Sequence, residues 1–294
     1  AVMSGTQDVI ISGGVEAMST VEIGSNIRDG LPNGRGIPKG ERLELQYPGI
    51  QFSQFDGAEL LAEKYAITRA DLDAFGLLSH QRAQAATDNG YFKEEVVPLN
   101  IKLVDDSVDV HLVDEGIRGA ATLEGMQSLK TLREGGVITA GTASQISDGS
   151  AAIMIANEMA VAKYNLPVRA KIHSLAVVGS DPVIMLEGPI PATQKVLEKA
   201  GLTIEDIDLY EVNEAFGSVP LAWAKAVGAD LEKLNVNGGA QALGHPLGGT
   251  GAKLMTTLVH ELERQKKRYG LLAICEGGGT ANAMIIERMD SVTA

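Results

Sequence analysis

The chain has 294 residues, enough for about two domains and a sizeable core. With 25 Lys and Arg against 38 Asp and Glu, its formal net charge is −13, which excludes a general basic surface for nucleic acid or an anionic membrane. No run approaches the roughly 18 apolar residues of a membrane-spanning helix, no charged-then-apolar leader opens the sequence, and the single cysteine, Cys275, excludes an intrachain disulfide. We therefore expect a cytoplasmic protein with no metal site, no nucleic-acid partner and no membrane partner.

The first part of the chain mixes glycine-rich loops with helical patterns. An apolar run at residues 8–14 ends in glycines and predicts a buried parallel strand. Residues 19–48 are rich in glycine and proline, which predicts an excursion from the sheet. A helix is expected over residues 56–65, and a second begins with the capping pattern at Thr68 and continues to residue 89.

Strand patterns become more frequent after residue 96. Weak alternation at residues 96–112 predicts a hairpin. The small, polar stretch at 139–149 leads into a strand at 151–156, and it is either a close backbone approach to a ligand or an ordinary connector.

From residue 167 onward, strand and helix patterns alternate, which predicts an α/β fold with a mostly parallel sheet. A weak echo between residues 8–14 and 271–278 suggests two similar halves, the first of them incomplete. The expected elements are a strand at 168–178, a helix at 191–200, a strand at 208–212, a helix at 215–227, a strand at 234–237, a helix at 251–265, and strands at 270–275 and 281–287.

Three polar residues follow predicted strands, at the sheet edge where α/β proteins place their ligands. Asn213 follows one strand and is either a ligand-facing amide or a helix N-cap. His245 lies in a glycine-dense turn before a helix, where backbone N–H groups favour an oxyanion; the alternative is a structural histidine. Cys275 ends a strand before three glycines, where exposed amides would lower its pKa, unless it is a small buried apolar residue.

These residues by themselves predict a Cys/His acyl-transfer or hydrolase site. A dinucleotide dehydrogenase fits less well, because the glycines at 248–251 lack the required spacing after a first strand.

Three motifs in the chain resemble, in order, the C-terminal motifs of the thiolases, which are acyl-CoA C-acyltransferases. The motifs are N-E-A-F at 213–216, G-G-A with L-G-H-P and G-G-T-G between 238 and 251, and C-E-G-G-G at 275–279. The similarity extends back through 117–123 and 139–144 to 12–19, so it covers in effect the whole chain.

The resemblance implies a layered αβαβα fold of two similar halves. We place the remainder of the N-terminal half at residues 1–165, with an inserted loop lobe at about 19–139, and the C-terminal half at 166–294. The implied function is cleavage of 3-ketoacyl-CoA with CoA, or condensation of acyl-CoA units, in fatty acid metabolism and lipid degradation. The substrates are CoA and acyl-CoA thioesters, no other cofactor is needed, and the implied assembly is a homodimer or homotetramer.

The resemblance also implies roles for individual residues. In thiolases a nucleophilic cysteine takes the acyl group, while a second thiol acts as acid and base. Accordingly, His245 activates the nucleophile and lines an oxyanion hole, Cys275 is the acid/base thiol, and Asn213 orients a water at the thioester oxygen. Ser144 and Arg118 resemble CoA-contacting positions.

The backbone of Gly244 and Gly277 is expected to serve the oxyanion sites.

In thiolases the nucleophilic cysteine precedes the strand at 8–14, so we expect the chain as given to lack that N-terminal part and to be inactive alone. Either the chain is a fragment or another chain supplies the missing piece. Two alternatives stay open: a non-catalytic thiolase-like scaffold or lipid-binding partner, and a hydrolase that uses Cys275 and His245. Residues 52–57 differ from the acyl-pocket segment of many thiolases, which leaves the acyl group undefined.

Overall fold

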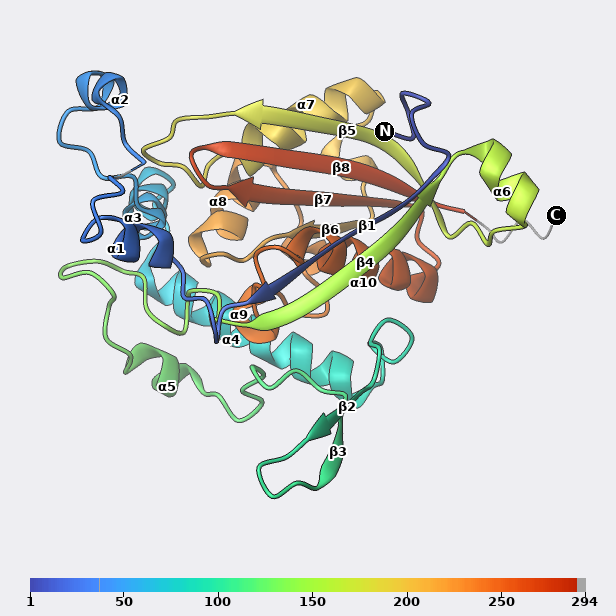
Figure 1. The fold of residues 1–294 in the computed structure, drawn as a ribbon, viewed down its shortest axis with the longest axis horizontal. Helices are drawn as coiled ribbons and strands as arrows, with labels where there is room; N and C mark the ends of the chain where they lie inside the picture. Colours follow the sequence, from blue (N-terminus) through green and yellow to red (C-terminus); the bar gives the residue numbers. More distant parts are fainter. Residues whose placement is uncertain (37, 290–294) are drawn as a thin grey trace.

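The computed structural model describes residues 1–36 and 38–289, and in these residues the strands form three sheets (Figure 1). The strands are β1 (Val9–Ala17), β2 (Leu99–Lys102), β3 (Val108–His111), β4 (Asp148–Ala156), β5 (Ala170–Gly179), β6 (Leu209–Val212), β7 (Tyr269–Glu276) and β8 (Thr280–Arg288). The α-helices are α1 (Ser25–Gly30), α2 (Glu41–Gln46), α3 (Gln54–Lys64), α4 (Arg69–Asp88), α5 (Leu123–Gln127), α6 (Glu158–Tyr164), α7 (Pro189–Ala200), α8 (Ser218–Val227), α9 (Ala240–Leu243) and α10 (Thr250–Gln265). Short 3₁₀ turns occupy Ile204–Asp206 and Leu231–Lys233.

The largest sheet has the strand order β5-β8-β7-β6 and is mostly antiparallel. Only β6 and β7 within it run parallel. The prediction of a mostly parallel sheet is therefore wrong. The reason lies in the connection at residues 277–279, which is too short for a crossover, so β8 must return antiparallel beside β7.

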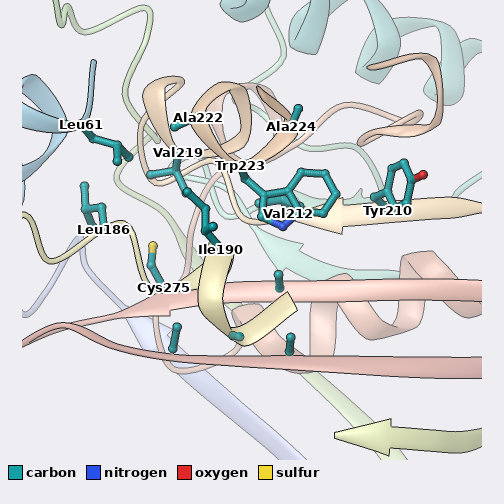
Figure 2. Packing of buried hydrophobic residues seen from close by; sticks show 14 of the residues in the cluster. Leu61, Leu186, Ile190, Tyr210, Val212, Val219, Ala222, Trp223, Ala224 and Cys275 are labelled. Carbon is teal, nitrogen blue, oxygen red and sulfur yellow. The ribbon is translucent and has the colours of Figure 1, made fainter. Parts of the chain in front are cut away.

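Alternate side chains of β7 enter two different apolar clusters, which is why this strand reads as a continuous apolar run. Leu271 and Cys275 belong to the cluster that includes residues of α7 and α8. Leu272 and Ile274 belong to the cluster beneath α10. Figure 2 shows part of the first cluster, around the fully buried side chain of Trp223. The sheet is thus covered by helices on both faces.

Helix α10 lies between the large sheet and the two-stranded sheet of β1 and β4, and contacts both (Figure 1). The described residues therefore stack as α7 and α8, the large sheet, α10, and the β1–β4 sheet, which are four layers of a mixed α/β fold. The expected buried parallel strand at 8–14 is instead antiparallel to β4. It is also largely exposed, since the side chains of Ile11 and Val15 are 73% and 72% accessible.

The inserted segment between β1 and β4 carries the predicted long helix and hairpin. Helix α4 begins with the expected capping box, in which Thr68 and Asp71 bond each other's backbone N–H groups. The hairpin of β2 and β3 projects from the body of the molecule (Figure 1). The 19–48 region, predicted as a loop, also contains the short helices α1 and α2.

The strand predicted at 234–237 is absent from the described structure. Leu234 makes a single parallel bridge to Tyr210, and the next residue, Asn235, has a φ of +45°, which ends extended pairing. The side chain of Asn235 takes the place of the backbone hydrogen bonds that a further strand would make. Its Oδ1 accepts from the Val212 N–H and its Nδ2 donates to the Val212 carbonyl, each at 2.9 Å.

Among the described helices, none is both long enough and apolar enough to cross a membrane.

Candidate active site

Asn213 and His245, 32 residues apart in the sequence, meet beyond the end of β6. The backbone N–H of Asn213 donates to the Ala273 carbonyl on β7 at 3.1 Å, so the sheet holds its position. Its side-chain Nδ2 lies 3.2 Å from His245 Nε2. The fold therefore brings together two of the three side chains that the sequence singled out as catalytic.

The hydrogen bonds around His245 define its tautomer. The Thr250 hydroxyl donates to the Pro246 carbonyl at 2.8 Å, and the same oxygen lies 2.6 Å from His245 Nδ1. Because the hydroxyl proton is already used, Thr250 Oγ1 accepts from Nδ1–H. The lone pair of the ring is consequently on Nε2, where it accepts from the Asn213 amide.

The imidazole of His245 is neutral at physiological pH. Burial lowers its pKa from 6.5 to about 4, and the positive charge of Lys253 adds to this effect. A neutral ring with an unprotonated Nε2 is a proton acceptor, which is the state that general-base catalysis requires.

The second polar atom of the Asn213 side chain has no partner. Its Oδ1 is buried and accepts no hydrogen bond within the described chain. A buried amide oxygen without a donor is costly, and such atoms are usually satisfied by a water or a ligand. The Asn213 Oδ1 atom can therefore accept a hydrogen bond from a bound molecule.

The turn that carries His245 depends on a glycine at 244. Gly244 has a φ of +77°, and a Cβ there would lie 2.0 Å from Ser147 Oγ. Its N–H, however, donates to the Ala240 carbonyl at 3.0 Å as the cap of α9. The oxyanion role expected for the Gly244 backbone stays a prediction, and the hydrogen bond of its N–H to Ala240 does not support it.

Gly277, the other predicted backbone position, lies in the turn between β7 and β8. It is exposed, and no hydrogen bond takes up its N–H within the described residues. The turn is held from the side by Glu276, whose carboxylate accepts from Thr280 Oγ1 at 2.9 Å and from Asn282 Nδ2 at 2.6 Å.

Cys275 is buried at the end of β7, and its sulfur lies in the apolar cluster near Leu186 and Ile190 (Figure 2). Burial raises the pKa of its thiol to about 12, and the charge of Glu276 acts in the same direction. The expected lowering of this pKa is wrong, because apolar side chains surround the sulfur. No hydrogen bond between Cys275 and His245 occurs in the described part of the chain.

Ser144 lies beside the N-E-A-F segment. Its N–H donates to the Ala215 carbonyl at 2.9 Å, and Ala143 pairs with Phe216.

Arg118 is exposed and is not joined to Asn213 or His245 by any hydrogen bond of the described residues. Its guanidinium donates to the Glu115 carbonyl at 2.8 Å, and its backbone N–H donates to His80 Nδ1 at 3.1 Å.

Two residues of the site were not predicted. Thr250 has a weak sequence signal, as a hydroxyl within a run of glycines five residues after His245. Glu214 has a stronger one, since an acidic residue at the end of a buried strand must find donors.

Comparisons with known proteins match both halves of the chain. A family model described as the N-terminal domain of thiolase matches residues 1–159, and one described as the thiolase C-terminal domain matches residues 166–288. A steroid 3-ketoacyl-CoA thiolase of Mycobacterium tuberculosis is 49% identical over 291 residues, covering 98% of this chain and 70% of that protein.

Solved structures give the same result. A crystal structure of human mitochondrial 3-ketoacyl-CoA thiolase superposes with a TM-score of 0.86 at 39% identity, over 98% of this chain and 74% of that chain. A structure of the same human enzyme in complex with CoA has a TM-score of 0.84, again at 39% identity, over 98% of this chain and 73% of that chain.

Proposed function

Because the chain belongs to the thiolase family, whose activity is acyl-CoA C-acyltransfer, we propose that it cleaves 3-ketoacyl-CoA with CoA or condenses acyl-CoA units in reverse. CoA and its thioesters are the proposed ligands, as CoA is in the human complex. The proposal rests above all on one observation: a neutral His245 whose Nε2 lone pair faces Asn213 in a buried site.

In the proposed reaction His245 has two successive tasks. Its Nε2 first removes the proton of a nucleophilic thiol, and the resulting imidazolium then donates Nε2–H to the thioester oxygen as negative charge develops there. Asn213 Oδ1, which lacks a donor, orients a water that donates to the same oxygen. Both effects are stronger in the transition state than in the ground state, which is what catalysis requires.

Cys275 is proposed to be the acid/base thiol. A pKa raised to about 12 keeps it protonated at neutral pH, so it is ready to give its proton to the carbon that leaves as an enolate. The thiolate left behind then takes the proton of the incoming CoA thiol, which attacks the acyl group. A resting protonated thiol suits this order of events better than it suits the nucleophile of a Cys275 hydrolase.

The acyl-carrying thiol is not assigned to any of these 294 residues, whose one cysteine is Cys275. The Gly277 N–H is a proposed oxyanion donor, and Ser144 and Arg118 are proposed CoA contacts. The half boundaries at 165 and 166, the cytoplasmic location and the homo-oligomer remain predictions.

The decisive experiment is thiolysis of acetoacetyl-CoA by the full-length protein and its His245→Ala variant. We expect loss of at least about 100-fold in kcat for His245→Ala, the usual contribution of a general base. His111→Ala, on the β3 hairpin, is the matched histidine control and should retain activity.

Each alternative has its own outcome in that assay. Equal activity in His245→Ala and the wild type would refute the catalytic assignment. An inactive wild-type protein that still binds acyl-CoA would favour the non-catalytic scaffold. Release of free acid with water as acceptor, together with an acyl adduct on Cys275 by peptide mass spectrometry, would establish the hydrolase.

A further inference from the structure

The carboxylate of Glu214, the residue after Asn213, joins three separate segments. Glu214 is 1% exposed. Its Oε2 accepts from Ser79 Oγ on α4 at 2.8 Å and from the backbone N–H of Gln241 at the start of α9 at 3.1 Å. Its Oε1 accepts from Asn235 Nδ2 at 2.9 Å, and the side-chain amide of Gln241 donates more weakly to Oε2 at 3.4 Å.

The direction of these bonds follows from their partners. Ser79 Oγ already accepts from the Gly239 N–H at 3.0 Å, so its own proton is directed to Glu214. The other partners are N–H groups, which only donate. Gly239 itself lies so close that a Cβ there would be 2.2 Å from the carboxyl carbon of Glu214. The start of α9 is therefore packed directly against this carboxylate.

The Asn235 amide that donates to Glu214 also holds the residue before Asn213. Two hydrogen bonds of 2.9 Å join it to Val212: Asn235 Oδ1 accepts from the Val212 N–H, and Asn235 Nδ2 donates to the Val212 carbonyl. The contacts of Glu214 thus secure the backbone on both sides of Asn213.

Glu214 also holds the start of helix α9, the element that precedes the turn with His245. Helix α9 is only four residues long, and its cap residue, Gly244, is followed at once by His245. A short helix has little stability of its own, so the contacts at Gly239 and Gln241 determine where its end lies.

We propose that Glu214 is a positioning residue for the reaction: its carboxylate sets the distance between Asn213 and His245 by fixing β6 and α9 to one another and to α4. The inference rests on the proposed function. Glu214 itself does not contact the imidazole through any hydrogen bond of the described chain, so its effect is transmitted through Asn213 and α9.

Glu214→Gln tests the requirement for acceptors at both oxygens with almost no change in shape. If the new NH₂ replaces Oε1 it faces the Asn235 amide, and if it replaces Oε2 it faces Ser79 Oγ and the Gln241 N–H. Inversion of the Asn235 amide gives no relief, because its NH₂ would then face the Val212 N–H. Either orientation opposes a donor to a donor.

We expect kcat for thiolysis to fall about 100-fold in Glu214→Gln while KM for CoA stays within about twofold, since a small displacement of reacting groups costs this much.

Asp208→Ala is the matched control. Asp208 also bonds two backbone N–H groups, those of Arg268 and Tyr269, but it lies just before β6, at the end opposite Asn213. Its loss should lower stability without a comparable change in kcat. A Glu214→Gln enzyme with kcat near the wild-type value, or a kcat loss equal to that of Asp208→Ala, would overturn the proposal.

A second readout does not depend on turnover, so it separates a failure of this inference from a failure of the proposed function. The pKa of His245, followed by NMR of histidine-labelled protein, should be near 4 in the wild type and higher in Glu214→Gln, because a displaced ring is less completely buried. An unchanged His245 pKa would contradict the inference even if the wild type proved inactive. Should Glu214→Gln not fold, Ser79→Ala removes one donor to Glu214 together with the acceptor of the Gly239 N–H. A wild-type kcat and an unchanged His245 pKa in that variant would equally refute the proposal.

Discussion

At the scale of single residues, the hydroxyl of Thr250 determines which nitrogen of His245 is basic. Its proton is committed to the Pro246 carbonyl, so the oxygen presents an acceptor to Nδ1–H. A buried N–H left without an acceptor costs about 1 to 3 kcal/mol, which corresponds to about one to two orders of magnitude in rate.

Replacement of Thr250 by valine tests this assignment. Thr250→Val keeps the shape but leaves Nδ1–H without an acceptor, so we expect kcat/KM to fall about 10- to 100-fold. Thr250→Ser restores the oxygen and should retain most activity. Steady-state thiolysis with both variants is the measurement, and equal activities would show that the hydroxyl does not set the tautomer.

The residues themselves were predictable to different degrees. Asn213, His245 and Cys275 stand at the ends of strand patterns, and so they could be singled out from the sequence. The raised pKa of Cys275 was not foreseen, because it depends on which face of β7 the sulfur occupies. The contacts of Glu214 with Ser79 and Asn235 span 135 and 21 residues, and no local pattern encodes them.

At the scale of elements, β1 touches the loop that separates His245 from Thr250. A Cβ on Gly14 would lie 1.7 Å from the Gly248 carbonyl oxygen, and one on Gly248 would lie 2.5 Å from the Val15 carbonyl. The two backbones are thus in direct contact, and the Gly248 N–H donates to Glu16 Oε2 at 3.1 Å.

We expect Gly14→Ala to displace this loop. The added methyl group should destabilise the protein by about 1 to 3 kcal/mol, the usual cost of overpacking, and should lower kcat through the movement of His245. Gly179→Ala, at the end of β5, is the control because its Cβ would meet no atom within 4 Å. Urea unfolding and thiolysis of both variants are the measurements; a Gly14→Ala protein as stable and active as Gly179→Ala would contradict the contact.

Local signals predicted the longer helices α3, α4, α7, α8 and α10 but not the short helices α1, α2, α5, α6 and α9, and strand pairing could not be predicted without the fold. The capping box at Thr68, and the glycines at 201 and 228 with φ of +66° and +72°, end or begin helices where expected. These signals act within a few residues. The direction of β1 and of β8, by contrast, is set by partners far along the chain or by turn length, which periodicity alone does not report.

At the scale of the whole molecule, a buried acid links the inserted segment to α10. Glu95 accepts from Thr257 Oγ1 at 3.2 Å, while its Oε2 lies 3.5 Å from His260 Nδ1 and has no hydrogen-bond partner in the described chain. Burial raises the pKa of Glu95 to about 7. The smaller influences come from the Thr257 hydrogen bond and the charges of Lys253, Glu261 and Asp114.

This raised pKa makes overall stability depend on pH. Between pH 4.5 and 7 the folded state binds more protons at Glu95 than the unfolded state, so the contribution of this group to stability is complete below 4.5 and is lost as the pH rises through 7. Glu95→Gln cannot ionise. We expect the variant to match the wild type at pH 5 and to exceed its stability at pH 8 by up to about 3 kcal/mol.

Urea unfolding at the two pH values measures this difference. Glu94→Gln, an exposed neighbour in the same segment, should show no such change. A gain in stability for Glu95→Gln that is the same at pH 5 and pH 8 would show that ionisation is not its cause.

The fixed hydroxyl of Thr250 has one more consequence. Because Nδ1–H is held by a hydroxyl that accepts its hydrogen bond and whose own proton is committed to Pro246, the imidazole of His245 exchanges protons only at Nε2. The ring therefore stores a proton and does not relay it. A proton that Nε2 takes from a thiol cannot leave through Nδ1 towards solvent. It must be returned to the reacting molecules, which couples the two half-reactions through one stored proton.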